Sequence, residues 1–113
     1  MIKAVFYSRN NEYFGFKITG HADYGCCGKD VVCAGTSALV INTVNSIDRF
    51  TDDSTVTEET SDGGLVKFKV IGKVSPESKL LLRSLRLGLC SIYEEYGDKY
   101  IRIYFREVKS CLR

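Results

Sequence analysis

The sequence predicts a single α+β domain over residues 1–113, with two helices covering one mixed sheet of about five strands in the order β-β-α-β-β-α-β. Two observations support this fold class. Five short segments alternate apolar and polar residues or are rich in β-branched residues, as half-buried strands are. Two longer segments carry apolar residues at helical spacing. A chain of 113 residues can bury one core without disulfides or metals.

The N-terminal half contains a predicted hairpin followed by a helix. Residues 2–7 and 13–19 are predicted as its strands, and the polar segment 8–12 between them as a turn. Segment 20–28 follows, with three glycines that favour a loop. Residues 31–50 are mostly apolar, and we expect a buried helix that ends near residue 50.

The C-terminal half contains a second predicted hairpin, a second helix and a last strand, with no internal sequence repeat. Strands at 55–60 and 65–71 flank the turn Ser61-Asp62-Gly63-Gly64. Ser75-Pro76-Glu77 starts the second helix, with a capping serine, proline at the first helical position and an acid in the first turn. Gly97 should end it after Tyr96, and 100–108 closes the chain as a strand. We expect a solvated acidic edge, rather than a docking patch for a basic partner, at Asp52, Asp53, Glu58, Glu59 and Asp62.

Composition excludes several classes of protein. The hydrophobic fraction is 44% and the charged fraction 27%, as in ordinary soluble domains. A formal charge of +2 is too small to predict a nucleic-acid partner, and no uninterrupted apolar stretch approaches the roughly 18 residues of a membrane span. Five cysteines are an odd number, and no secretory signal precedes the first strand. We therefore expect free thiols and a cytoplasmic protein.

A histidine and a cysteine flank the glycine segment and predict nucleophilic chemistry. His21, the only histidine, ends the second predicted strand, and Cys33 falls in the first turn of the first helix if Asp30 is its N-cap. Unpaired N–H groups and the helix dipole stabilise an anion there, which a thiol with an ordinary pKa of ~8.5 needs in order to react at neutral pH. A nearby imidazole would accept the proton.

Other readings of these residues stay open. A free cysteine such as Cys33 often only fills core space. Asp30 either caps the helix or contacts and orients His21. Ser37, one helical turn after Cys33, either hydrogen-bonds near the thiolate or packs as a small residue. Tyr24 either lines a substrate groove or packs the loop.

The other cysteines raise a metal and a redox alternative. Cys26 and Cys27 together with His21 and Cys33 suggest zinc, but structural zinc ligands usually pair as C-x2-C, and adjacent cysteines project in different directions. We therefore expect no metal and no cofactor. A disulfide between Cys33 and Cys26 or Cys27 is the redox alternative. Cys90 is expected in the core.

Segment 20–39 holds short motifs at fixed separations, namely Gly20-His21-Ala22, Tyr24, Gly28, Asp30, Val32-Cys33-Ala34 and Ser37-Ala38-Leu39. This set resembles the signature of the ribosomal-processing cysteine proteases called Prp, which runs Gly-His-Ala, a glycine loop, Asp-Ile/Val-Val-Cys-Ala and Ser-Ala-Leu. Length and element order agree over nearly the whole chain. Gly35-Thr36 stands where small or apolar residues such as Ala-Val are common, and Cys26-Cys27 is not part of the signature.

The resemblance implies a cysteine endopeptidase with no cofactor. Cys33 would be the nucleophile and His21 the base and then the acid, with Asp30 and Ser37 in support. The substrate loop would contain Gly20, Tyr24, Gly25 and Gly28.

The substrate implied is the precursor of large-subunit ribosomal protein twenty-seven, which would lose its N-terminal extension. Similar proteins form homodimers, which suits the second helix, whose apolar residues extend around more than one face. The rival hypothesis is a non-catalytic ribosome-associated binding module that holds the precursor without cutting it. We expect neither a nucleic acid nor a membrane as partner.

Overall fold

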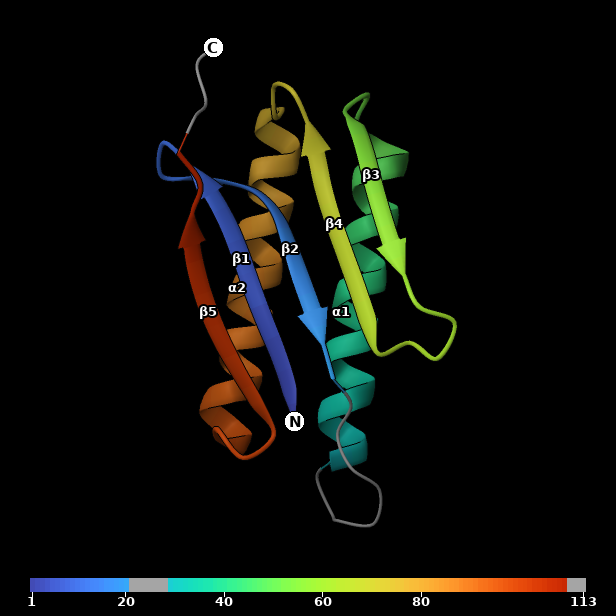
Figure 1. Cartoon of the computed structure of the whole chain (residues 1–113), viewed down its shortest axis with the longest axis vertical. Coiled ribbons are helices and arrows are strands. Elements are labelled where there is room, and N and C mark those ends of the chain that lie inside the picture. Colours follow the sequence, from blue (N-terminus) through green and yellow to red (C-terminus); the bar gives the residue numbers. More distant parts are fainter. Residues whose placement is uncertain (21–28, 110–113) are drawn as a thin grey trace.

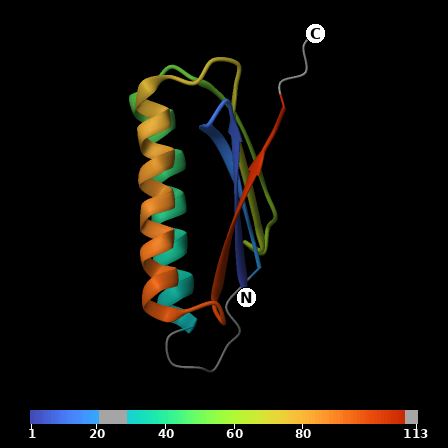
Figure 2. The same ribbon diagram turned by 90° about the vertical axis from the view of Figure 1, so that its left-hand side faces the viewer.

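One five-stranded sheet carries both helices on the same face (Figures 1 and 2). The structure is a computed structural model that describes residues 1–20 and 29–109. Its elements are β1 (Ile2–Arg9), β2 (Glu12–Thr19), α1 (Lys29–Phe50), β3 (Ser54–Glu59), β4 (Leu65–Ile71), α2 (Pro76–Tyr96) and β5 (Ile101–Glu107). This order and the mixed sheet confirm the predicted fold class, and the two helices, whose relative placement the sequence left open, share one face.

The strand order across the sheet is β3-β4-β2-β1-β5. Neighbours are antiparallel except β1 and β5, which run parallel, with Ile2 opposite Ile101 and Phe6 opposite Phe105. The N-terminal strand therefore lies beside the last strand, and β3 and β5 form the two edges.

The turn between β1 and β2 is tighter than predicted. Both strands extend into the predicted segment 8–12, which leaves a two-residue turn at Asn10 and Asn11. Their φ angles are 55° and 65°, the left-handed conformation that asparagine adopts more readily than most residues. The register shifts next to this turn: Tyr7 faces Gly15, whereas Ser8 faces Tyr13. Strand β2 therefore has one extra residue, Phe14, at this point, as in a β-bulge.

The core fills the space between the sheet and the helices. Phe6, Phe16 and Phe68 lie side by side on three neighbouring strands, each almost completely buried, and the rings of Phe16 and Phe68 stack at a centroid distance of 5.4 Å. Burying each such side chain contributes about 2–3 kcal/mol. The helices contribute Val32, Val40 and Ile47 from α1 and Leu82, Leu85 and Leu89 from α2.

The start of α2 is fixed by hydrogen bonds to Asp53, the residue directly before β3. Ser75 caps the helix, its Oγ accepting from the Ser78 N–H at 3.1 Å. The Ser75 N–H and hydroxyl both donate to Asp53 Oδ2, at 3.0 and 2.8 Å. Partial burial alone would raise the pKa of Asp53, but the neighbouring Ser78 hydroxyl and the two bonds from Ser75 outweigh it and hold the pKa below its ordinary value of 3.8.

The predicted end of α2 is confirmed, since Gly97 follows Tyr96 with φ 91° and its N–H donates to the Tyr93 carbonyl at 2.8 Å. A close approach of α1 and α2 requires small residues. A Cβ on Gly88 would lie 2.7 Å from Cδ1 of Leu39, and a Cβ on Gly35 would lie 3.4 Å from Cδ1 of Ile92. The helices therefore pack with almost no space at these two positions.

Helix α1 is long and apolar enough to cross a membrane, since Val31–Phe50 has a mean hydropathy of 1.2. This corrects the expectation that no stretch reaches that length. The finding rests on length and composition only, and core helices pass the same test. Here 28% of that stretch is buried, including Val32, Val40 and Ile47, so core packing accounts for part of the apolar composition. Val31, Ile41 and Phe50 are exposed.

Candidate active site

Cys33 lies on the wall of a cavity of about 180 Å³. The cavity opens between the N-terminal half of α1, the lower end of the sheet in Figure 1 and the β3–β4 hairpin. Cys33 is half-buried and free. The other lining residues are Thr36, Ser37, Val40 and Ile41 of α1, Ile2, Ile18, Gly20 and Val66 of the sheet region, and Glu59 and Gly63 of the hairpin.

Helix α1 begins two residues earlier than predicted. It starts at Lys29, so Asp30 is the second helical residue rather than the N-cap, and Cys33 is the fifth. Aspartate is favoured both at the cap and in the first turn, because both positions lie at the positive end of the helix dipole, so its presence alone could not fix the helix start. Cys33 remains within about one turn of that end.

Gly20 ends β2 in a conformation that only glycine adopts easily. Its φ is +90°, and a Cβ built there would overlap the carbonyl oxygen of Met1. Its N–H donates to the Gly64 carbonyl at 2.9 Å, which ties the end of β2 to the β3–β4 hairpin. These constraints explain why a glycine stands directly before His21 in the sequence. Gly20 lines the same cavity as Cys33.

Two hydroxyls of α1 line the cavity beside the thiol. Ser37 is exposed and shares the wall with Cys33, as its helical spacing predicts, while its role stays a prediction. Thr36 was noted only as a departure from the Prp pattern. It is 3% exposed, and its Oγ1 has no hydrogen-bond partner in the part of the chain that the structure describes, whereas Thr43 Oγ1 donates to the Leu39 carbonyl at 2.8 Å. A buried hydroxyl in this state is available to a ligand.

Glu59 and Gly63 line the cavity although their sequence context does not predict them as site residues. The predicted acidic edge is divided by the fold: Glu59 lines the Cys33 cavity, whereas Asp53 accepts hydrogen bonds from Ser75. Glu59 follows Cys33 by 26 positions in the chain, and only the pairing of β3 with β4 brings it there. The alternation of Thr55, Thr57 and Glu59 on one side of β3 was the available signal.

Several predicted site residues lie outside the described residues, namely His21, Tyr24, Gly25 and Gly28, together with Cys26 and Cys27 of the zinc and redox alternatives. Within residues 1–20 and 29–109, no group of three or more potential metal ligands occurs. Cys90 is half-buried rather than a core residue, and it lines a hollow between α2 and β5. Tyr93 of α2 and Tyr104 of β5 also line this hollow.

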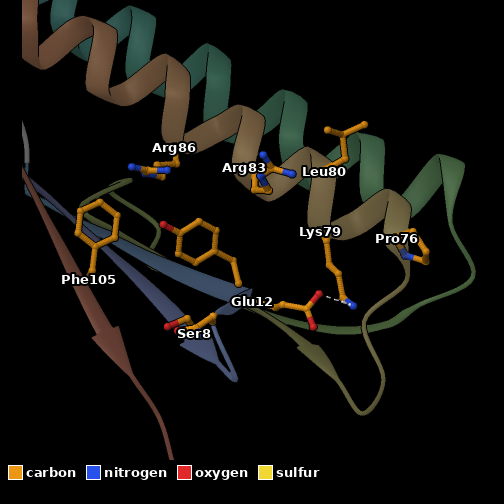
Figure 3. Close-up of a pocket in the computed structure, with 10 residues that line it drawn as sticks. Ser8, Glu12, Pro76, Lys79, Leu80, Arg83, Arg86 and Phe105 are labelled. Atoms are coloured by element: carbon orange, nitrogen blue, oxygen red, sulfur yellow. Dashed lines mark ion pairs between the residues drawn. The ribbon is translucent and has the colours of Figure 1, made fainter.

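A larger cavity of about 650 Å³ lies at the other end of α2, between this helix, the β1–β2 hairpin and β5 (Figure 3). Lys79 pairs with Glu12 at 2.7 Å across its mouth, and the Arg86 guanidinium lies 5.4 Å from the centre of the Phe105 ring. None of the described residues that line it is a cysteine or histidine. Nucleophilic chemistry therefore belongs to the smaller cavity.

A half-buried thiol near a helix N-terminus, facing a cavity with apolar walls, defines the class of cysteine hydrolases that act through a thiolate. The family model described as cysteine protease Prp matches residues 1–102. The chain belongs to this family of cysteine proteases, as the motifs of segment 20–39 predict.

Curated relatives carry the same description. The ribosomal processing cysteine protease Prp of Staphylococcus aureus is 33% identical over 87 residues, which cover 77% of this chain and 81% of the relative. The protein of that name from Bacillus subtilis is 30% identical over 95 residues, 80% of this chain and 85% of the relative.

Solved structures share the fold. The S. aureus ribosomal processing protease Prp in complex with a covalently linked product peptide has a TM-score of 0.85 and 29% identity, covering 94% of this chain and 100% of that one. The same protease in complex with a substrate peptide gives a TM-score of 0.84 at 28% identity, with the same coverage. A Streptococcus mutans protein gives 0.84 at 27% identity, covering 96% of each chain.

Proposed function

We propose that this protein is an endopeptidase that acts in the cytoplasm and removes the N-terminal extension from the precursor of large-subunit ribosomal protein twenty-seven. Cys33 is the nucleophile and His21 the general base. The observation that carries the proposal is the shared cavity of Cys33 and Gly20, the residue directly before His21. The relatives named for ribosomal processing, and the S. aureus protease bound to a substrate peptide and to a covalently linked product peptide, support it.

The reaction follows from these two groups. The Cys33 thiol gives its proton to the His21 imidazole, and the sulfur attacks the scissile carbonyl. The amide nitrogen takes that proton as it leaves, so a thioester remains on Cys33. His21 then accepts a proton from water, which attacks the thioester and releases the acid product and the free thiol.

The cavity selects the substrate by size and polarity. Ile2, Ile18 and Val66 give it apolar walls, and its volume of about 180 Å³ resembles that of an engineered apolar cavity of roughly 150 Å³ that holds benzene. One apolar side chain next to the scissile bond fits such a space. The Thr36 hydroxyl then donates to or accepts from a peptide group of the substrate.

The test is intact-mass analysis of the extended ribosomal protein after incubation with the chain. The wild type should yield one pair of new masses that locates the cut, and Cys33→Ala should yield none, a loss of more than about a thousandfold because the nucleophile is absent. Cys90→Ala, a second free and half-buried thiol, should cut as the wild type does. Cleavage by Cys33→Ala would overturn the assignment, and a precursor held but not cut by the wild type would indicate the binding module instead.

We further propose that the active form is a homodimer joined through the outer face of α2. Leu80 and Leu87 stand one heptad apart on this helix and are 63% and 70% exposed. A C2 contact would bury the same patch on both copies. Sedimentation should show that the wild type is a dimer and that the double variant Leu80→Glu, Leu87→Glu is a monomer. The control Phe50→Glu, at an exposed position at the end of α1, should remain a dimer. A monomeric wild type contradicts the proposal.

A further inference from the structure

The side of the sheet opposite the helices carries a high density of positive charge. Figure 2 shows both helices on one side, which leaves the other without a covering element. We call this side the helix-free face and define it by the three rows of side chains that cross the sheet through Lys3, Val5 and Tyr7 of β1. Its basic residues are Lys3, Lys17, Lys67, Lys69, Arg102 and Arg106, and the single acid in these rows is Glu58.

The basic residues are arranged in a way that costs stability. Lys17 lies directly opposite Lys67, and Lys3 directly opposite Arg102. Like charges in directly opposed positions are destabilising, with partners ~5 Å apart. Among the described residues, none of the six basic side chains of this face makes an ion pair within 4.0 Å. Glu58, directly opposite Lys67 on the other side, offsets only part of this repulsion. A polyanion laid across the face would relieve the rest.

A hollow of about 520 Å³ deepens one end of the helix-free face. The hollow lies along the row of Arg106, Tyr7 and Lys69, where the chain passes closely at Gly15: a Cβ there would overlap the Phe68 carbonyl oxygen. The cations around the hollow are Arg9, Lys67, Lys69 and Arg106, and the aromatic rings are Tyr7 and Phe14; no acid lines it. The Arg9 guanidinium is held 4.4 Å from the centre of the Phe14 ring.

Exposed aromatic surface lies among these cations. Tyr104 is 43% exposed and stands in the row of Lys17 and Lys67, across Val5. Proteins recognise single-stranded nucleic acids with two elements: cations that bind the phosphates and aromatic rings on which the bases stack. This face has both. A second copy of this face would be repelled by its own charge, and an acidic peptide has no base to stack.

We propose that the helix-free face binds single-stranded RNA, with phosphates on its six cations and a base on Tyr104. The choice of RNA rather than DNA rests on the proposed function. A ribosomal protein, the proposed substrate, itself binds RNA, so an enzyme that processes it works close to RNA. A formal charge of +2 conceals this surface, since the face carries six of the 16 basic residues and one of the 14 acidic residues, so the rest of the chain is net acidic. This proposal differs from the sequence-based expectation of no nucleic-acid partner.

The experiment measures fluorescence anisotropy of a labelled oligouridine RNA of about twelve nucleotides with the Cys33→Ala chain, so that binding is read without proteolysis. Lys67→Glu, Lys69→Glu and Arg106→Glu together should weaken binding more than about tenfold and flatten the slope of log K against log salt by about 2, or ~0.7 for each lost phosphate contact. Arg49→Glu, Arg83→Glu and Arg86→Glu make the same charge change on the exposed helix surfaces and should weaken it less than about twofold.

Tyr104→Ala should weaken RNA binding by about tenfold, whereas Tyr104→Phe, which keeps the ring, should not. Circular dichroism and thermal melting establish that each variant is folded. Equal losses in the two triple variants would overturn the proposal, as would no binding by the parent chain. Tighter binding of polyglutamate, of phosphatidylglycerol vesicles or of the matching DNA would overturn the choice of RNA. Absence of protease activity in the wild type would overturn the proposed function and the argument for RNA over DNA, but not nucleic-acid binding by the cations and Tyr104.

Discussion

The two faces of the sheet are made from alternate residues of the same strands, yet they serve different purposes. On β4, Phe68 is 1% exposed and stacks on Phe16, while its neighbours Lys67 and Lys69 are half-exposed without an ion-pair partner among the described residues. Stability comes from the covered face, because burial of apolar surface dominates folding. The helix-free face is therefore free to hold charges that a core would not tolerate.

The largest expected effect compares the covered face and the helix-free face on one strand, β4. Phe68→Ala should lower the free energy of unfolding by about 3–5 kcal/mol, because it removes a fully buried ring and leaves a cavity. Lys69→Ala, the adjacent residue on the other face, should change it by less than about 0.5 kcal/mol. Urea denaturation of both variants measures the difference; similar losses would mean that both faces contribute to stability.

A second effect concerns the end of β2, beside the Cys33 cavity. Gly20→Ala combines a left-handed φ with an overlap on the Met1 carbonyl, and should lower the unfolding free energy by roughly 3 kcal/mol. Gly72→Ala has a similar φ of +80° but nothing within 4 Å of the new Cβ, so roughly 1 kcal/mol should be lost. Equal losses in denaturant melts would show that the approach of Met1 is unimportant.

Asp53 provides a smaller effect that depends on pH. Its pKa is lowered in the folded chain, so its contribution to stability is present above about pH 3.8, the unfolded value, and is lost as pH falls through the folded pKa. Asp53→Asn should therefore lower the unfolding free energy by about 1 kcal/mol at pH 7 and by less at pH 3. Urea melts at pH 7, 5 and 3 measure this, and a gap that widens towards acid would contradict the assignment.

The smallest effect should be a gain on the helix-free face. Lys17→Glu replaces the repulsion across from Lys67 with attraction, and should raise the unfolding free energy by about 0.5 kcal/mol at low salt. The gain should fade at 1 M salt because exposed charges are screened. The same variant should bind RNA less tightly, so stability and binding move in opposite directions. Loss of stability at low salt would argue that the cations of this face do not repel one another.

Local patterns predicted most of the fold. Alternation along β4 placed Phe68 and Val70 on the buried side, and Ser75, Pro76 and Gly97 fixed both ends of α2. These signals succeed because strand period, helix capping and glycine conformation depend on residues close in the chain. The start of α1 was predicted two residues late, since an aspartate suits the cap and the first turn equally.

The site was predictable only where it is local in sequence. Segment 20–39 brings Gly20, Cys33 and Ser37 to one cavity, as the motifs indicate. Glu59 and Gly63 reach it through strand pairing, which composition and periodicity do not specify. The helix-free face was missed for the same reason: net charge sums residues that the register separates onto different faces.

The Cys33 cavity is lined by residues 2 to 66, while α2 and β5 supply none of its described walls. Since β5 pairs in parallel with β1, the sheet acquires its last edge from the end of the chain. Synthesis at about 5–20 residues per second therefore delivers the whole lining several seconds before the strand that completes the sheet. During synthesis, Cys33 and the other residues that line its cavity therefore leave the ribosome before β5 can pair with β1 and complete the sheet.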